Sequence, residues 1–137
     1  MITLKTLLAA AAVLVVSVLL TVLYMVVYGT LINPGHPQSV YDAHVQAAGP
    51  YLSIVFGAPL MYVACRYVAR RVGPAMALRA ALSVWGIYVV VDGAILLASG
   101  ALATASTEVR IVAVLSQLAK LVAAYVAARG VVAARGT

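Results

Sequence analysis

One carboxylic acid and one amine lie inside long apolar stretches of this sequence, and they are the side chains best placed to do chemistry. Asp92 lies about eight residues inside its stretch, ~12 Å deep at 1.5 Å per residue, and Lys120 is near the middle of the next stretch. A charge at the centre of a bilayer costs roughly 2.5–3.5 kcal/mol, so each should face protein, trapped water or a partner. In an antiparallel hairpin Asp92 is level with residue 115 or 116, within reach of the Lys120 side chain.

This arrangement predicts a charge pair that opens when a proton, an ion or a small solute enters. The alternative is a static pair that only fixes packing, within one chain or between two chains. Intramembrane ionisable groups are functional candidates by default, but the chain supplies only one of each sign at this depth.

Polar or irregular residues of the other apolar stretches fall at a similar depth. Pro59 removes the hydrogen bond to the carbonyl of Val55 and, with Gly57 beside it, predicts a kink in its helix. We therefore predict a layer that binds a substrate or an ion, although small and hydroxyl residues also serve simply to pack membrane helices together. The members of this layer are Asp92, Lys120, Gln117, Ser116, Tyr24, Tyr28, Tyr88, Trp85 and Ser53.

Four apolar runs must position these side chains, at residues 7–31, 50–69, 80–99 and 109–128. Each run is near or above the ~20 residues that a helix needs to cross a bilayer. Apolar residues make up 66% of the chain and charged residues 9%, against about 45–50% and ~25% in soluble domains. In lipid the backbone must pair within its own segment, so these runs are helices. We predict an all-α polytopic membrane protein, a four-helix transmembrane bundle forming one domain over residues 1–137.

The longest polar segment is the loop at residues 32–49, which we expect on the outer face. Ser39 followed by Asp42 matches the S-x-x-D pattern of a helix start. Apolar residues recur beyond it at helical spacing, which predicts a short helix at the membrane interface. Gly49 and Pro50 then end that helix, since proline suits the first turn of the next one.

The sequence gives little support for a metal site, a cofactor or an enzymatic activity. His36, Asp42 and His44 of the outer loop could hold a metal, but Asp42 and His44 are two residues apart and poorly placed to share a helix face. Cys65 is the only cysteine, which excludes an intrachain disulfide or a thiolate cluster. No histidine lies in an apolar run to hold a haem. We predict no metal, no cofactor and no enzyme.

The formal net charge of +6 is carried at helix ends rather than along a basic stripe, so nucleic acid is not an expected partner. Positive residues mark the cytoplasmic side of short loops. The outer loop has none, and the last loop has only Arg110. Both termini are therefore predicted to be cytoplasmic, in a bacterial inner membrane, on the side of Lys5, Arg66, Arg70, Arg71, Arg79, Arg129 and Arg135.

Two functions fit these features. The first is a small oligomeric transporter, channel or solute binder that uses the polar layer around Asp92 and Lys120. The second is an accessory subunit that packs against a larger membrane complex or against copies of itself, through faces rich in alanine, glycine and valine. The cost of two buried charges favours the first.

Overall fold

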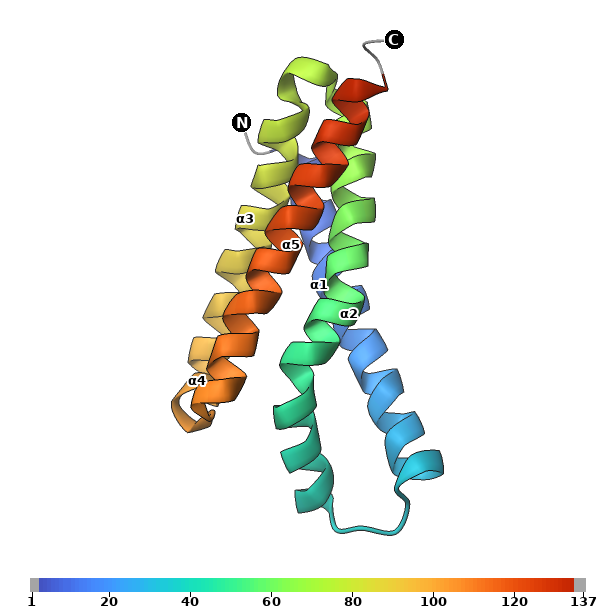
Figure 1. Ribbon diagram of the computed structural model, residues 1–137, viewed down its shortest axis with the longest axis vertical. Coiled ribbons are helices and arrows are strands. Elements are labelled where there is room, and N and C mark those ends of the chain that lie inside the picture. Colours follow the sequence, from blue (N-terminus) through green and yellow to red (C-terminus); the bar gives the residue numbers. More distant parts are fainter. Residues whose placement is uncertain (1–2, 135–137) are drawn as a thin grey trace.

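The computed structural model describes residues 3–134, and every regular element in that range is helical. The order along the chain is α1 (Leu4–Val27), the π-helix η1 (Tyr28–Ile32), α2 (Gln38–Val72), α3 (Pro74–Ala98), α4 (Ala101–Thr104) and α5 (Thr107–Ala133). Four long helices run side by side as a bundle (Figure 1). These are α1 with η1, α2, α3 and α5, and all are long and apolar enough to cross a membrane. The predicted all-α class is confirmed, and so is the presence of four helices that could span a membrane.

Local chemistry explains where these helices begin. Thr3 caps α1 by accepting a hydrogen bond from the Thr6 backbone N–H, and Ser106 caps α5 by accepting one from Val109. Between α2 and α3, Gly73 has a φ of 85°, which favours glycine. Pro74 follows as the first residue of α3, where its missing N–H leaves no bond unmade.

The separate interfacial helix expected in the first loop is not formed. Residues 38–72 are one continuous helix with Pro50 and Pro59 inside it, Pro37 rather than Ser39 is the N-cap, and the predicted loop at 32–49 shrinks to residues 33–37. The helix continues through Pro50 because this residue removes only one backbone hydrogen bond, and because side-chain contacts hold the first turns of α2 against the end of the first helix. His44 of these turns packs against α1 and η1.

The other helices also extend beyond their predicted limits. The prediction of 80–99 for the third helix begins six residues late, and that of 109–128 for the last ends five residues early. Arginine explains the difference, because it is a good helix former and need not end a helix where the apolar run stops. Arg79 and Arg129 both lie within helices.

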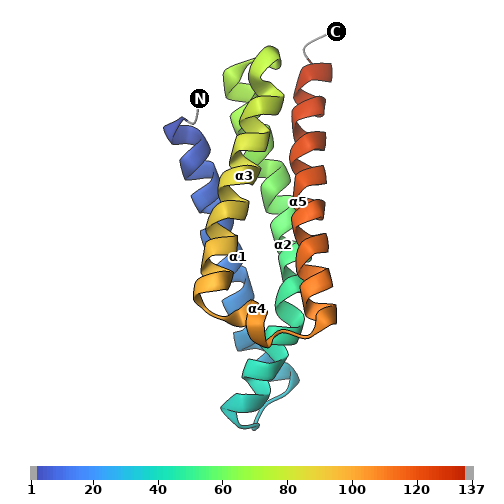
Figure 2. The same cartoon turned by 90° about the vertical axis from the view of Figure 1, so that its left-hand side faces the viewer.

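The bundle has two unlike ends (Figures 1 and 2). The termini end carries the start of α1, the end of α5 and the α2–α3 turn, while the α4 end carries α4 and the loop at 33–37. Figure 2 shows the α1–α2 hairpin extending past the α3–α5 hairpin at the α4 end. Helix ends rich in cations gather at the termini end, whereas Arg110 lies near the α4 end; Arg135 lies outside the described residues.

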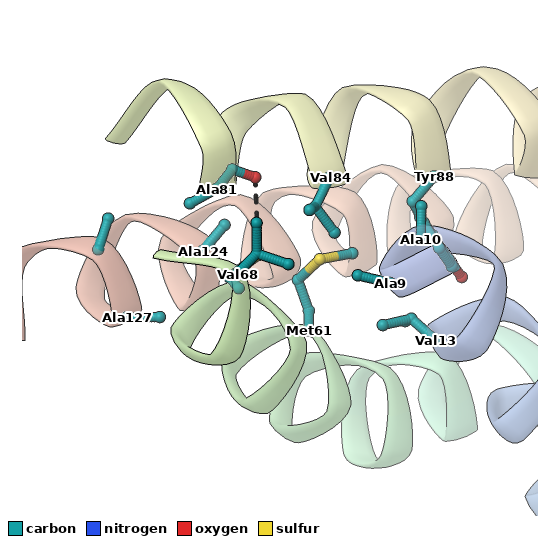
Figure 3. Close-up of a cluster of buried hydrophobic side chains, with 12 residues drawn as sticks. Ala9, Ala10, Val13, Met61, Val68, Ala81, Val84, Tyr88, Ala124 and Ala127 are labelled. Atoms are coloured by element: carbon teal, nitrogen blue, oxygen red, sulfur yellow. Dashed lines mark hydrogen bonds between the residues drawn. The ribbon is translucent and has the colours of Figure 1, made fainter. Parts of the chain in front are cut away.

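The core lies in the half of the bundle nearer the termini end. Figure 3 shows the Met61 side chain of α2 surrounded by small residues of the other three long helices. The Cys65 thiol donates to the Ala81 carbonyl at 3.6 Å. Small side chains let membrane helices approach closely, and half of this core is alanine. Its buried residues are Ala9, Ala10, Val13, Met61, Cys65, Val68, Ala81, Val84, Tyr88, Ala124, Ala127 and Ala128.

Candidate functional site

Lys120 of α5 is fully buried at the level where the core ends. Its Nζ donates to the Ser53 Oγ of α2 at 2.6 Å and to the Ser116 Oγ of its own helix at 3.0 Å. Ser116 also donates to Ser53, at 3.0 Å between the two oxygens. The ammonium lies 4.7 Å from the ring centroid of Tyr88 in α3. A buried cation is thus held by two hydroxyls and an aromatic face, and it joins three helices.

Gly57 of α2 provides the space for this lysine. A Cβ atom at position 57 would lie 2.5 Å from Lys120 Cε and 3.3 Å from Nζ. Nonbonded carbon atoms do not approach each other this closely, so the lysine side chain would have to shift. The predicted role of Gly57 was a helix kink with Pro59, and the structure adds that its missing side chain admits the lysine. In both views α2 changes direction near its middle.

Asp92 of α3 is bound by a different partner. Gln117 Nε2 donates to Asp92 Oδ2 at 2.7 Å, and Trp85 Nε1 donates to the backbone carbonyl of Gln117 at 3.2 Å. Gln117 Oε1 is buried and has no hydrogen-bond partner. A buried acceptor without a donor carries a free-energy penalty of about 1–3 kcal/mol. It is therefore a point where a bound donor would be stabilising.

The predicted direct pair of Asp92 and Lys120 is not formed. Among the hydrogen bonds and ion pairs of residues 3–134, the Asp92 carboxylate accepts from Gln117, and the Lys120 ammonium donates to Ser53 and Ser116. The geometry is that of two charges held apart by neutral polar groups. Each charge keeps its hydrogen bonds, and the carboxylate keeps one oxygen that no side chain of this network occupies.

An open pocket with a volume of about 1070 Å³ lies between the first turns of α2 and the α4 ends of α3 and α5. Ser53, Asp92 and Gln117 lie at its inner end, toward the middle of the bundle, and residues of α4 line the opposite end, which we call the mouth. Its walls are largely apolar. The wall residues include Val45, Ala47, Val89, Leu96, Leu97, Leu102, Val109, Ala113 and Val114.

Tyr24 and Tyr28 do not join this site. The Tyr24 hydroxyl lies 3.1 Å from His44 Nε2, and the Tyr28 ring stacks on the His44 imidazole with centroids 3.8 Å apart and planes 2° from parallel. Tyr41 meets Tyr28 edge-on and donates its hydroxyl proton to the Asn33 carbonyl at 2.9 Å. These residues form an aromatic cluster that ties the first turns of α2 to α1.

The predicted outer-loop residues His36, Asp42 and His44 are therefore dispersed. Asp42 Oδ1 accepts a hydrogen bond from Gln38 Nε2 at 3.0 Å, His36 is exposed, and His44 belongs to the aromatic cluster. No group of three histidine, cysteine, aspartate or glutamate residues within 3–134 is placed to hold a metal ion.

Sequence reasoning predicted a binding layer at this depth but missed the two glycines that widen the pocket, Gly49 and Gly93. Both line the pocket, and a Cβ atom added at either would meet nothing within 4 Å. It also missed α4, whose residues line the pocket. The signal of these glycines was weak, because a glycine inside a membrane helix more often marks close packing.

The comparisons with other proteins add no function. No family model matches the chain, and no curated protein or solved structure is similar enough to it to count as a match.

Proposed function

We propose that this chain binds a small solute in the pocket at the α4 end and acts as one protomer of a small transporter or channel. The observation that carries the proposal is the composition of the pocket. Its walls are apolar, and its inner end carries an Asp92 carboxylate and the unpaired carbonyl oxygen of Gln117. Pockets of this kind, mostly apolar with a few convergent polar groups, are typical of small-molecule sites.

The position of the site along the bundle supports a role in transport. The pocket ends where Lys120 fills the space over Gly57, so a polar layer separates an open half of the bundle from a closed half. Membrane transporters place their binding sites near the middle of the bilayer, next to irregular helices. Pro59 lies one half-turn beyond Gly57 on the closed side and lacks the N–H that would bond Val55.

The charge asymmetry of the two ends supports an orientation. We place the termini end, with its lysine and arginines, in the cytoplasm by the positive-inside rule. The pocket then opens on the outer face of a bacterial inner membrane. The first turns of α2, which extend past the α3–α5 hairpin, lie in the outer interfacial region.

An accessory subunit is the second candidate, and α1 is the observation that favours it. All four buried residues of α1 lie within its first ten positions: Thr6, Ala9, Ala10 and Val13. Beyond Val13, α1 presents exposed leucine and valine side chains such as Leu19 and Leu23. Lipid, a second copy of this chain, or a larger membrane complex would cover that face.

Native mass spectrometry of the protein released from a mild detergent separates the two candidates. We expect a homo-oligomer that retains a small molecule. Gly93→Leu should fill the pocket and abolish that retention, because the new side chain projects into open space. The matched control is Gly86→Leu on the same helix, which adds the same side chain outside the pocket lining and should leave retention unchanged.

The opposite result would favour the accessory candidate. It consists of a larger protein that co-purifies with wild-type and Gly93→Leu chains alike, with no bound small molecule in either. Asp92→Asn gives a second discrimination. It should abolish retention with expression largely intact if the pocket binds a solute, and should only lower the yield if Asp92 serves packing.

A further inference from the structure

We infer that the solute is an amphipathic amine: a protonated amine that carries at least one N–H and is attached to an apolar body. This inference rests on the proposed binding function and specifies its ligand. It follows from three properties of the pocket: the hydrogen-bonding character of its inner end, the sign of the charge that it presents, and the chemistry of its walls.

The inner end of the pocket offers acceptors more than donors. Asp92 Oδ2 is bonded to Gln117, which leaves Oδ1 available, and Gln117 Oε1 has no partner. A ligand with several N–H donors would satisfy what the protein leaves open.

The donors near the inner end are already engaged. The Gln117 amide donates to Asp92, and Ser116 donates to Ser53. At the mouth, the Arg110 guanidinium donates to the Ala103 carbonyl at 3.2 Å. An anionic ligand would therefore find no free cation at the inner end and would face the Asp92 carboxylate.

Of the described residues, Asp92 is the only carboxylate that lines the pocket, and it lies at the inner end although a lysine lies close by. Lys120 is fully buried and is absent from the lining, because its ammonium is turned to the two serines. Arg110 does line the pocket, but it is seven residues from Gln117 along α5, or ~10 Å at 1.5 Å per residue. Its side chain is exposed at the mouth, and salt screens exposed charges. Glu108 lies at the same end and accepts a hydrogen bond from Tyr51 at 2.9 Å.

The apolar walls of the pocket favour a ligand with an apolar body. They are formed mainly by valine, leucine and alanine side chains, and the volume of about 1070 Å³ accommodates a molecule of drug size. A hydrated metal ion or a small polar cation would leave those walls in contact with water. An amine with an aromatic or alkyl body would place its charge at Asp92 and its carbon skeleton against the walls.

Four probes with one naphthylmethyl body separate these properties: the primary amine, its trimethylammonium analogue, the alcohol and the naphthylacetate anion. Binding is measured by calorimetry on the wild-type chain in lipid nanodiscs. A hydrogen bond to a charged group contributes about 1.5–3 kcal/mol, so the amine should bind about 10-fold to 100-fold tighter than the alcohol. The trimethylammonium probe, which has no N–H, should bind more weakly than the amine. The anion should bind weakest.

Asp92→Asn tests the residue that carries the inference. It should reduce the affinity for the amine to that for the alcohol, and should change the affinity for the alcohol by less than about threefold. The matched control is Asp42→Asn, which removes an exposed carboxylate outside the pocket and should change neither affinity.

The outcomes are distinguishable from a failure of the binding function itself. If the alcohol or the anion binds as tightly as the amine and Gly93→Leu abolishes that binding, the pocket binds solutes but the amine class is wrong. If none of the four probes binds the wild-type chain, both the ligand class and the proposed function are overturned. If Asp92→Asn leaves the affinity for the amine unchanged, the assigned role of the carboxylate is wrong.

Discussion

The two halves of this bundle are built from similar residues but differ in how closely their helices approach. Near the termini end, alanines of α1, α3 and α5 close around Met61, which has no exposed surface. Near the α4 end, the first turns of α2 stand away from α3 and α5 and leave the pocket between them. Both halves are apolar, so hydrophobicity alone does not decide which half is closed. The polar groups gather at the boundary, where Lys120 and Asp92 face two serines and an amide.

The largest effect should come from the closed half. Met61→Ala removes a fully buried side chain, and its free energy of unfolding should fall by about 2–5 kcal/mol, as for other large-to-small core substitutions. Leu97→Ala in the wall of the pocket should lower it by less than about 1 kcal/mol, because this side chain is 73% exposed. Unfolding in mixed detergent and sodium dodecyl sulfate measures both. Equal losses would show that the two halves are packed alike.

A double-mutant cycle tests the boundary between the halves. Gly57→Ala brings a Cβ atom into Lys120 Cε and should lower the free energy of unfolding by about 1–3 kcal/mol, the usual penalty for overpacking. In a Lys120→Ala background the same change should be neutral or stabilising, since the obstructing chain is gone and alanine is the better helix former. A loss of equal size in both backgrounds would mean that Lys120 does not lie over Gly57. Gly86→Ala is the control, because a Cβ atom there meets nothing within 4 Å.

A smaller effect is expected from the hydroxyls that hold the lysine. Ser53→Ala removes one of the two oxygens bound to Nζ and should lower the free energy of unfolding by about 1–2 kcal/mol. Lys120→Met replaces the cation by an apolar side chain of similar length. In that background Ser53→Ala should cost less than about 0.5 kcal/mol, since no charge then lacks a partner. The lysine site would be refuted if the Lys120→Met change left the loss undiminished.

The smallest effect should appear on the surface near the mouth. Tyr51→Phe removes the hydroxyl that donates to Glu108 and should change the free energy of unfolding by less than about 0.5 kcal/mol, because both side chains are exposed. The same unfolding measurement checks it. A loss above 1 kcal/mol would indicate that this contact braces α2 against α5 and helps to set the width of the pocket.

Much of the fold could be predicted from the sequence because helices that can cross a membrane appear as long apolar runs. The errors concern what happens at the ends of those runs. Pro50 was interpreted as a boundary, yet the contact of His44 with Tyr24 and Tyr28 keeps the helix continuous on either side of it. Such tertiary contacts between residues 16 to 20 positions apart cannot be read from local pattern.

The site was predictable in part for the same reason. Depth along each helix brought Asp92, Ser116 and Gln117 to one level, with Lys120 about a turn deeper, and the structure places these residues together. The depth of a residue does not determine which way its side chain points around the helix axis. Tyr24 and Tyr28 therefore fell at nearly the right height but on a face that meets His44. The choice of Gln117 rather than Lys120 as the partner of Asp92 also depends on rotation and rotamer.

Thiol labelling tests most directly the claim that one half of the bundle is open and the other closed. Cys65, the only cysteine of the chain, is fully buried in the closed half and serves as an internal control. Gly93→Cys places a second thiol in the wall of the pocket, where the added side chain meets no neighbour. With a charged, water-soluble thiol reagent and protein in lipid nanodiscs, we predict one label per Gly93→Cys chain and none on the wild type. Labelling of Cys65, or protection of the cysteine at position 93, would contradict the account.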